Sequence, residues 1–147
     1  MMRRTFLVVL ILVTTFSFVF GGNLGVKNII GEWKVYDTKT KLEKGFIKLE
    51  IQGDSLVLFQ EDNFGNWRKD ETVPIKPTKV GPKGIEFSKT FYNDVDTMRT
   101  IHKIEFTDFK KNTSTFSYSI KTEPSVDSLS LYSKFNIWYT GGFVVKK

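Results

Sequence analysis

Residues 97–120 read TMRTIHKIEFTDFKKNTSTFSYSI, and their pattern decides the fold class. Large side chains alternate with small or charged ones up to Thr107 and again from Phe116 to Ile120, with turn-forming residues from Asp108 to Asn112 between them. Such alternation puts every second side chain on one face of a β-strand. The stretch therefore predicts a hairpin. Its inward rows are Met98, Thr100, His102, Ile104 and Phe106 on one strand, and Phe116, Tyr118 and Ile120 on the other.

The same alternation recurs along most of the chain after residue 28, and no segment there has apolar residues at helical spacing with caps. Pro74 and Pro77 cannot donate ladder hydrogen bonds, so the strand before them ends there or lies at a sheet edge. We expect a loop over 77–84 and a turn at Gly141-Gly142. The remaining predicted strands are 29–36, 45–51, 55–60, 67–75, 85–92 and 129–139, with a short last segment at 143–147.

The chain is thus predicted to be all-β, an antiparallel meander of eight or nine strands. A long meander removes its open edges by closing into a barrel or by splitting into two packed sheets. Eight strands enclose enough space for side chains or for one small ligand. We expect a single barrel domain over residues 22–147, and a two-sheet β-sandwich is the alternative.

The first residues predict export. Arg3 and Arg4 precede Thr5–Phe20, a run of sixteen residues without a charge, and small residues follow at Gly21 and Gly22. A positive end, an apolar run and small residues are typical of a secretory signal peptide, and the run is shorter than the ~20 residues of a membrane-spanning helix. We expect a signal helix over residues 1–21 and a periplasmic or secreted mature chain. The alternative is an uncleaved anchor.

Composition argues against several classes of protein. Without Arg3 and Arg4 the chain has 20 basic and 16 acidic residues, a modest +4, and its lysines are scattered, so we expect no nucleic-acid partner. One histidine and no cysteine cannot supply a usual zinc site, and the acids are too dispersed for calcium, so no metal is expected. No nucleophile motif, phosphate loop or dinucleotide fingerprint occurs. We expect no catalytic residues, no cofactor and no enzymatic activity.

Two short motifs carry a resemblance to a known family. Gly31-Glu32-Trp33, preceded by two isoleucines, resembles the opening G-x-W of lipocalins and related calycin barrels. Thr107-Asp108-Phe109 is similar to the T-D-Y that lipocalins carry after the sixth strand, with Phe in place of Tyr. The resemblance implies a barrel whose closed end is plugged by Trp33, with Gly31 as its motif partner, and a basic residue packed across that ring. No arginine follows Arg99, so Lys146 or Lys147 would take this place.

The chain also departs from that family. It lacks the C-terminal helix of typical lipocalins. Only eight residues link the first two predicted strands, so the helical lid of fatty-acid-binding relatives is missing as well.

Several polar side chains share the rows that we expect to face inward. Lys89 stands in the row of Ile85, Phe87 and Phe91, and a buried lysine is costly unless it is paired. Lys89 could reach water at a strand end, a ligand could share the interior, or the register could be off by one residue and turn Lys89 outward. The second reading predicts a ligand-binding set formed by Lys89, Thr100, His102, Tyr118, Ser133, Phe135 and Tyr139.

The sequence therefore predicts an exported protein that holds a small hydrophobic or amphipathic molecule, with Lys89 suited to an anionic head group. Mostly apolar pockets with a few placed polar groups are typical of such sites. The alternative is a non-enzymatic envelope module whose barrel is packed solid and binds no ligand.

Overall fold

The computed structural model describes residues 22–95, 97–125 and 135–147, with side chains described for all of these except 135–140. Nine β-strands and one turn of 3-10 helix make up this part of the chain, so the all-β prediction is confirmed. No helix in the described ranges is long and apolar enough to span a membrane. The predicted signal helix over 1–21 lies outside them. The elements are η1 (Val26–Asn28), β1 (Gly31–Tyr36), β2 (Glu43–Gln52), β3 (Ser55–Glu61), β4 (Trp67–Pro74), β5 (Lys79–Val80), β6 (Ile85–Asn93), β7 (Met98–Lys110), β8 (Thr113–Pro124) and β9 (Phe135–Lys146).

The strands form one antiparallel sheet in the order β4-β3-β2-β1-β9-β8-β7-β6-β5. Strands that follow one another in the sequence pair, except β4 and β5, which are the two edge strands of the sheet. In addition, β1 pairs with β9. The meander is therefore confirmed. The closed barrel is wrong, because β4 and β5 are open ends of the sheet, and the two-sheet sandwich is wrong because the sheet is continuous.

The two edges of the sheet, β4 and β5, are connected by the segment that contains Pro74 and Pro77. Pro74 is the last residue of β4, and Pro77 follows in the connection to β5. Neither residue can donate a ladder hydrogen bond. The two-residue strand β5, within the predicted loop 77–84, pairs with Ile85 and Glu86 and so occupies the edge of β6 at its start. Consequently β4 and β6 approach each other without forming a ladder.

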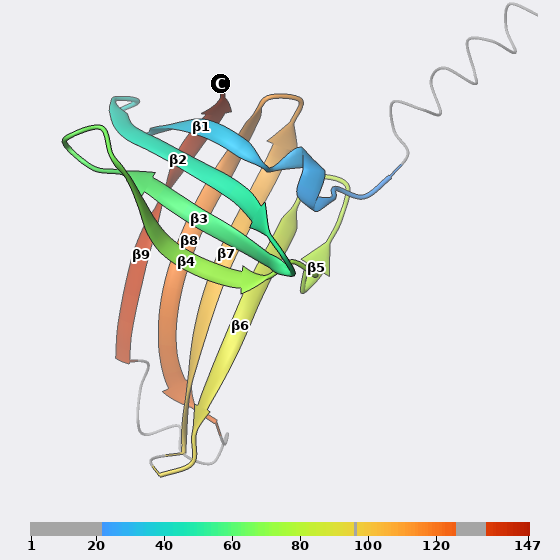
Figure 1. Ribbon diagram of the computed structural model, residues 1–147, viewed down its shortest axis with the longest axis vertical. Coiled ribbons are helices and arrows are strands. Elements are labelled where there is room, and N and C mark those ends of the chain that lie inside the picture. The colour runs from blue at the N-terminus through green and yellow to red at the C-terminus, as the bar shows by residue number, and fades with distance from the viewer. Residues whose placement is uncertain (1–21, 96, 126–134) are drawn as a thin grey trace, which may run out of the picture.

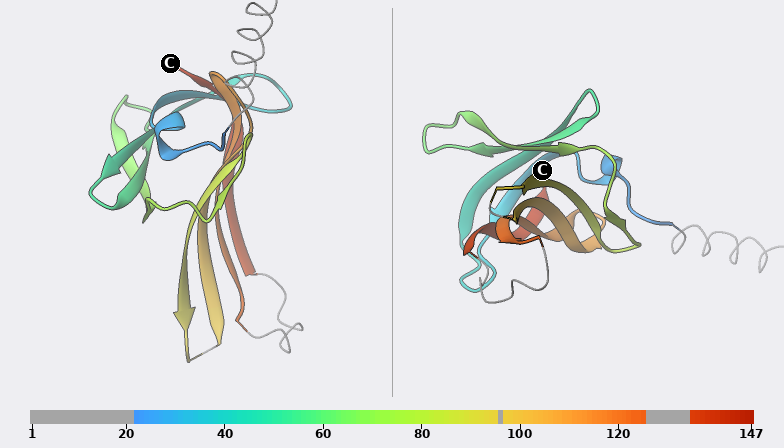
Figure 2. Two further views of the ribbon diagram at one scale, coloured as in Figure 1. Left: turned by 90° about the vertical axis from the view of Figure 1, so that its right-hand side faces the viewer. Right: turned by 90° about the horizontal axis from the view of Figure 1, so that it is seen from below.

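The sheet bends so that β1–β4 lie across the upper part of β6–β9, and β6–β9 continue below them (Figures 1 and 2). The buried core lies between these two halves, and apolar area removed from water there stabilises the bend. The inward rows predicted for the hairpin 97–120 are confirmed at its core end. The largest fully buried side chains include Trp33, Leu49 and Leu58 from the upper half and Phe87, Ile104, Phe106, Phe116 and Tyr118 from the lower half.

Trp33 is fully buried in this core. Its Nε1 donates a hydrogen bond to the Ile29 carbonyl oxygen at 2.8 Å, so the ring is buried without an unpaired donor. The ring packs 5.4 Å from Phe106 and 6.0 Å, edge-on, from Phe109. Lys146 Nζ lies 5.4 Å from its centroid. Of the two lysines that the resemblance offered for this place, Lys146 occupies it.

Gly31 adopts φ +113°, a conformation that side-chain-bearing residues rarely adopt, so the chain needs glycine two residues before Trp33. The predicted turn over 108–112 is shorter than expected. The strand β7 runs to Lys110 through an irregular register that begins after Thr107, with Asp108 at φ +49°.

The predicted turn at Gly141-Gly142 is wrong, because both glycines lie inside the continuous strand β9. Gly142 is needed for a different reason. A Cβ on Gly142 would come within 2.3 Å of the Tyr36 carbonyl oxygen and 3.1 Å of Val35 Cγ1. Glycine therefore allows β1 and β9 to pack closely at this point.

Candidate functional site

A buried carboxylate lies on the inner face of the sheet. Glu71 in β4 is only 6% exposed, and its neighbour on that face, Val73, belongs to the core. The register between β3 and β4 shifts at Leu58/Phe59: Leu58 pairs with Glu71 and Phe59 with Lys69, so Asp70 has no partner across the strand. A bulge of this kind re-aims the side chains that follow it. Here it places Glu71 among the apolar residues of the core.

Three side chains from three strands converge on this carboxylate. Lys89 Nζ of β6 lies 2.5 Å from Glu71 Oε1. His102 Nδ1 of β7 and the Tyr118 hydroxyl of β8 each lie 2.5 Å from Glu71 Oε2. The Thr72 backbone N–H also donates to Oε1, at 2.9 Å. We call Glu71, Lys89, His102 and Tyr118 the Glu71 cluster. Hydrogen bonds to a charged group are the strong ones, and here they bridge both halves of the sheet.

The donors keep Glu71 ionised. Burial by itself raises the pKa of this carboxyl group, but the hydrogen bonds from Lys89, Tyr118, His102 and the Thr72 backbone outweigh it and hold the pKa below its ordinary value. Burial, followed by the bond to the Glu71 carboxylate, raises the pKa of Tyr118 well above its usual range. Tyr118 is therefore a neutral donor that faces an anion.

An ionised Glu71 fixes the tautomer of His102. A carboxylate only accepts hydrogen bonds, so the 2.5 Å contact requires a proton on His102 Nδ1. In the neutral ring the other nitrogen, Nε2, is then an acceptor, and it becomes a donor only when the ring is protonated. A carboxylate that orients an imidazole in this way leaves Nε2 for a second partner.

The predicted ligand set is brought together in part. Lys89, His102 and Tyr118 meet at Glu71, which excludes the reading that turns Lys89 outward. Thr100 does not join them. It lies two residues before His102 in β7, and its hydroxyl is 3.1 Å from that of Thr122.

Three predicted residues remain untested. Ser133 lies outside the described residues. The backbones of Phe135 and Tyr139 pair with Thr122 and Ser119, but their side chains are outside the described part of the chain.

The inner face becomes more accessible along β6. Phe87 is fully buried, the Lys89 side chain is 26% exposed, and Phe91 is 56% exposed. The Phe91 ring meets the His102 ring edge-on at 5.5 Å, and Lys89 Nζ lies 5.4 Å from its centroid. The Glu71 cluster thus stands at the boundary between the packed core and a more open region. That region offers a ring, an ammonium group and an imidazole nitrogen.

Sequence reasoning missed Glu71. The residues of β4, WRKDETVP, show no clean alternation, because the bulge at Asp70 interrupts the period of two. The one available signal was the inward Lys89, which required a counter-charge from another strand.

Within the described ranges no three acidic, histidine or cysteine side chains gather as a metal site would require. Comparisons of this chain with protein-family models, with curated proteins and with solved structures give no match.

Proposed function

We propose that this protein is an exported, lipocalin-like binding protein that holds a small amphipathic molecule without changing it chemically. The observation that carries the proposal is the position of the Glu71 cluster on the inner face, between a packed end and an open end. In this proposal the ligand lies beyond the cluster, against the strands β6–β8. Figure 1 shows that these strands continue below the upper half of the sheet.

The exposed atoms of the Glu71 cluster determine which polar head group the ligand can have. Lys89 is balanced by Glu71, so the site does not require a full negative charge on its ligand. Its ammonium group has further N–H groups to donate, and neutral His102 offers Nε2 as an acceptor. A head group that both accepts and donates fits this pair, such as a hydroxyl, a protonated carboxylic acid or a primary amide. A deprotonated carboxylate fits when His102 is charged.

The apolar end of the ligand rests on Phe91. Phe91 is 56% exposed and lies in the same inward row of β6 as Lys89. Apolar area that is removed from water on binding contributes roughly 25 cal/mol per Å² before the costs of association. Aromatic walls with a few placed polar groups are typical of small-molecule sites.

The lipocalin-like assignment is supported by residues around Trp33. Gly31 needs its positive φ, and Phe109 and Lys146 both lie against the indole ring. These are the positions that the resemblance singled out. The sheet itself is open between β4 and β6, so the proposed likeness is limited to the residues around Trp33 and the order of the strands. Export rests on residues 1–21 alone.

The competing proposal is a module without a ligand, in which the Glu71 cluster only holds the two halves of the sheet together. The solid core around Trp33 favours it at that end. The two proposals differ in what Phe91 does, because a purely structural cluster does not need an exposed ring.

The test is native mass spectrometry of the full chain purified from its own host. We expect a bound small molecule in the wild type and its loss in Lys89→Met and in Phe91→Ser. The second variant changes an exposed residue and so keeps the fold. Phe64→Ser is the matched control, because Phe64 is 89% exposed in the connection between β3 and β4 and is not a member of the Glu71 cluster. A wild type without a bound molecule, or retention of the molecule by both variants, would contradict the proposal.

A further inference from the structure

The lower part of β6 is an unpaired edge of the sheet. The strand β5 pairs only with the first two residues of β6, and β6 continues below the upper half of the sheet (Figure 1). The Thr78 backbone N–H donates to the Glu86 carbonyl oxygen at 2.8 Å, so Glu86 directs its backbone groups toward this edge. Backbone groups alternate sides along a strand, so Thr90 and Tyr92 direct theirs the same way. In the described part of the chain no strand pairs with these two residues on this side, and we call residues 88–93 the free edge of β6.

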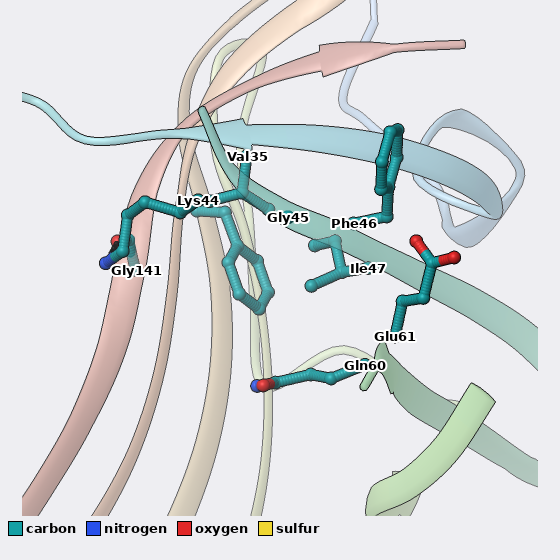
Figure 3. A pocket seen from close by; sticks show the side chains of 9 residues that line it. Val35, Lys44, Gly45, Phe46, Ile47, Gln60, Glu61 and Gly141 are labelled. Carbon is teal, nitrogen blue, oxygen red and sulfur yellow. Dashed lines mark hydrogen bonds between the residues drawn. The ribbon is translucent and has the colours of Figure 1, made fainter. Parts of the chain in front are cut away.

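Other edges of the sheet carry features that discourage pairing with another chain. The strand β4 has a bulge at Asp70, exposed charged residues at 68–70 and Pro74 at its end, and β5 is only two residues long. On the opposite side of the sheet, β1 pairs with β9 only from Phe143 to Lys146. Where that pairing ends, Lys44 Nζ donates to the Gly141 carbonyl oxygen at 3.1 Å (Figure 3). Bulges, edge charges, prolines and short strands are the usual protection of sheet edges.

The free edge of β6 lacks this protection. Its register with β7 is regular throughout, and it contains no proline. Its one charge, Lys89, is balanced within the chain by Glu71. Phe91 is 56% exposed and Tyr92 is 66% exposed, and they lie on opposite faces because successive side chains of a strand alternate. Unpaired backbone groups and exposed aromatic area on both faces favour the addition of another strand here.

We infer that the free edge of β6 pairs antiparallel with the same edge of a second copy of this chain, about a two-fold axis at Phe91. Thr90 then lies opposite Tyr92 of the second copy, and the two residues exchange N–H···O=C hydrogen bonds. The axis repeats this pair, so every backbone group that Thr90 and Tyr92 direct toward the edge gains a partner. The sheets of the two copies become continuous across the axis.

The residues of the free edge are complementary to themselves. A two-fold axis pairs a strand with itself in the antiparallel direction, so the same residues must fit on both sides. Phe91 faces Phe91 of the second copy in a pair without mutual backbone hydrogen bonds, where side chains approach closely and aromatic pairs are favourable. Lys89 lies opposite Asn93 of the second copy, so like charges do not meet. An axis at Lys89 would instead place two ammonium groups opposite each other.

Amide hydrogen exchange of the full chain, followed by NMR, tests the pairing residue by residue. One strand pair is a small interface, so we expect a weak, reversible dimer that is well populated at about 1 mM. Exchange of the Thr90 and Tyr92 amides should slow about fivefold between dilute solution and this concentration. The Phe91 amide faces β7 and should exchange at the same rate in both samples. Small-angle X-ray scattering should show a doubled mass in the concentrated sample only.

Two variants block the edge in different ways. Thr90→Pro removes an N–H that faces the edge and leaves the ladder to β7 intact, so it should stay monomeric in the concentrated sample. Thr90→Val keeps the N–H and should dimerise as the wild type does. Tyr92→Lys adds a charge to the edge without changing the backbone and should also be monomeric. Phe64→Lys adds the same charge in the connection between β3 and β4 and should leave the dimer unchanged.

The inference does not depend on a ligand at the Glu71 cluster. Thr90→Pro and Tyr92→Lys keep the cluster and Phe91, so each should retain a bound molecule while it is monomeric. The inference is wrong if the wild type stays monomeric in the concentrated sample, or if exchange slows equally at Phe91 and Thr90. A dimer that persists in both Thr90→Pro and Tyr92→Lys would likewise place the interface elsewhere.

Discussion

The Glu71 carboxylate and the Lys89 ammonium lie 2.5 Å apart across the seam of the sheet, where β4 and β6 approach each other without a ladder of backbone hydrogen bonds. A closed barrel would join these strands through their backbones. Here a side-chain contact does so instead, and His102 and Tyr118 extend it to the next two strands. The open seam and the buried carboxylate are therefore parts of one arrangement.

Glu71→Gln should lower the free energy of unfolding by about 2–3 kcal/mol. Removing one partner of a fully buried ion pair typically costs about 3–5 kcal/mol. The expected loss is smaller here because Lys89 can turn part of its charge toward water. Urea denaturation at neutral pH measures the change.

Glu50→Gln is the matched control. Glu50 Oε1 lies 3.1 Å from Lys48 Nζ, but the Glu50 side chain is 43% exposed, and surface pairs of this kind contribute about 0–1 kcal/mol. Equal losses in the two variants would mean that the Glu71 cluster behaves as a surface ion pair.

The contribution of Glu71 to stability should depend on pH. Its pKa is lower in the folded chain than in the unfolded one, so the folded state is favoured fully above the ordinary value of 4.5. That stability is lost as the pH falls through the folded pKa. The difference in unfolding free energy between wild type and Glu71→Gln should shrink below about pH 4.5, because the glutamine does not titrate. A difference that is constant from pH 7 to pH 3 would contradict an ionised Glu71.

Most strands could be predicted because alternation is a local property. The inward rows of β7 and β8 follow directly from the residues between Met98 and Ile120, and no distant contact is needed to find them. The predicted turn at Gly141-Gly142 in β9 is wrong for the same reason, because the prediction used only local residues. Gly141-Gly142 is locally a turn signal, and its actual cause is the approach of the Tyr36 carbonyl from another strand.

Closure and the candidate site could not be predicted, since both depend on pairing between distant residues. The gap between β4 and β6 depends on how far the sheet bends. The bend cannot be predicted from the residue pattern of any single strand. Glu71 meets Tyr118, a residue 47 positions later in the chain, only because a bulge at Asp70 sets the register of β4. Lys89 was identifiable from its place in an inward row, but its partner was not.

Gly142→Ala should destabilise the fold by about 1–3 kcal/mol, the usual range for overpacking a tight site. The added methyl group would press against the Tyr36 carbonyl oxygen, which belongs to the backbone and cannot turn aside. Gly81→Ala is the control, because its methyl group would lie 3.8 Å from the nearest atom, the Gly84 carbonyl oxygen. Thermal unfolding of both variants checks this, and an unchanged midpoint in Gly142→Ala would show that β1 and β9 are farther apart.

Lys146→Met should cost about 1 kcal/mol and shift the fluorescence of Trp33. The ammonium group lies over the indole ring at 5.4 Å, and a partly shielded cation–π contact contributes roughly 0.5–2 kcal/mol. The methionine keeps most of the apolar contact of the lysine stem, so the loss reports the ammonium group, which lies over the ring and also donates to the Asn28 carbonyl oxygen at 3.4 Å. Lys39→Met, in an exposed turn, should change neither quantity. If Lys146→Met has the fluorescence of the wild type, the Lys146 ammonium group does not lie over the Trp33 ring.

The most direct test of the Glu71 cluster is ¹⁵N NMR of the imidazole, because His102 is the only histidine and gives a single pair of nitrogen signals. In the neutral ring we expect a proton on Nδ1 and none on Nε2, and we expect this preference to be lost in Glu71→Gln. A wild-type ring that carries its proton on Nε2, or one that does not respond to Glu71→Gln, would show that the carboxylate does not hold the imidazole.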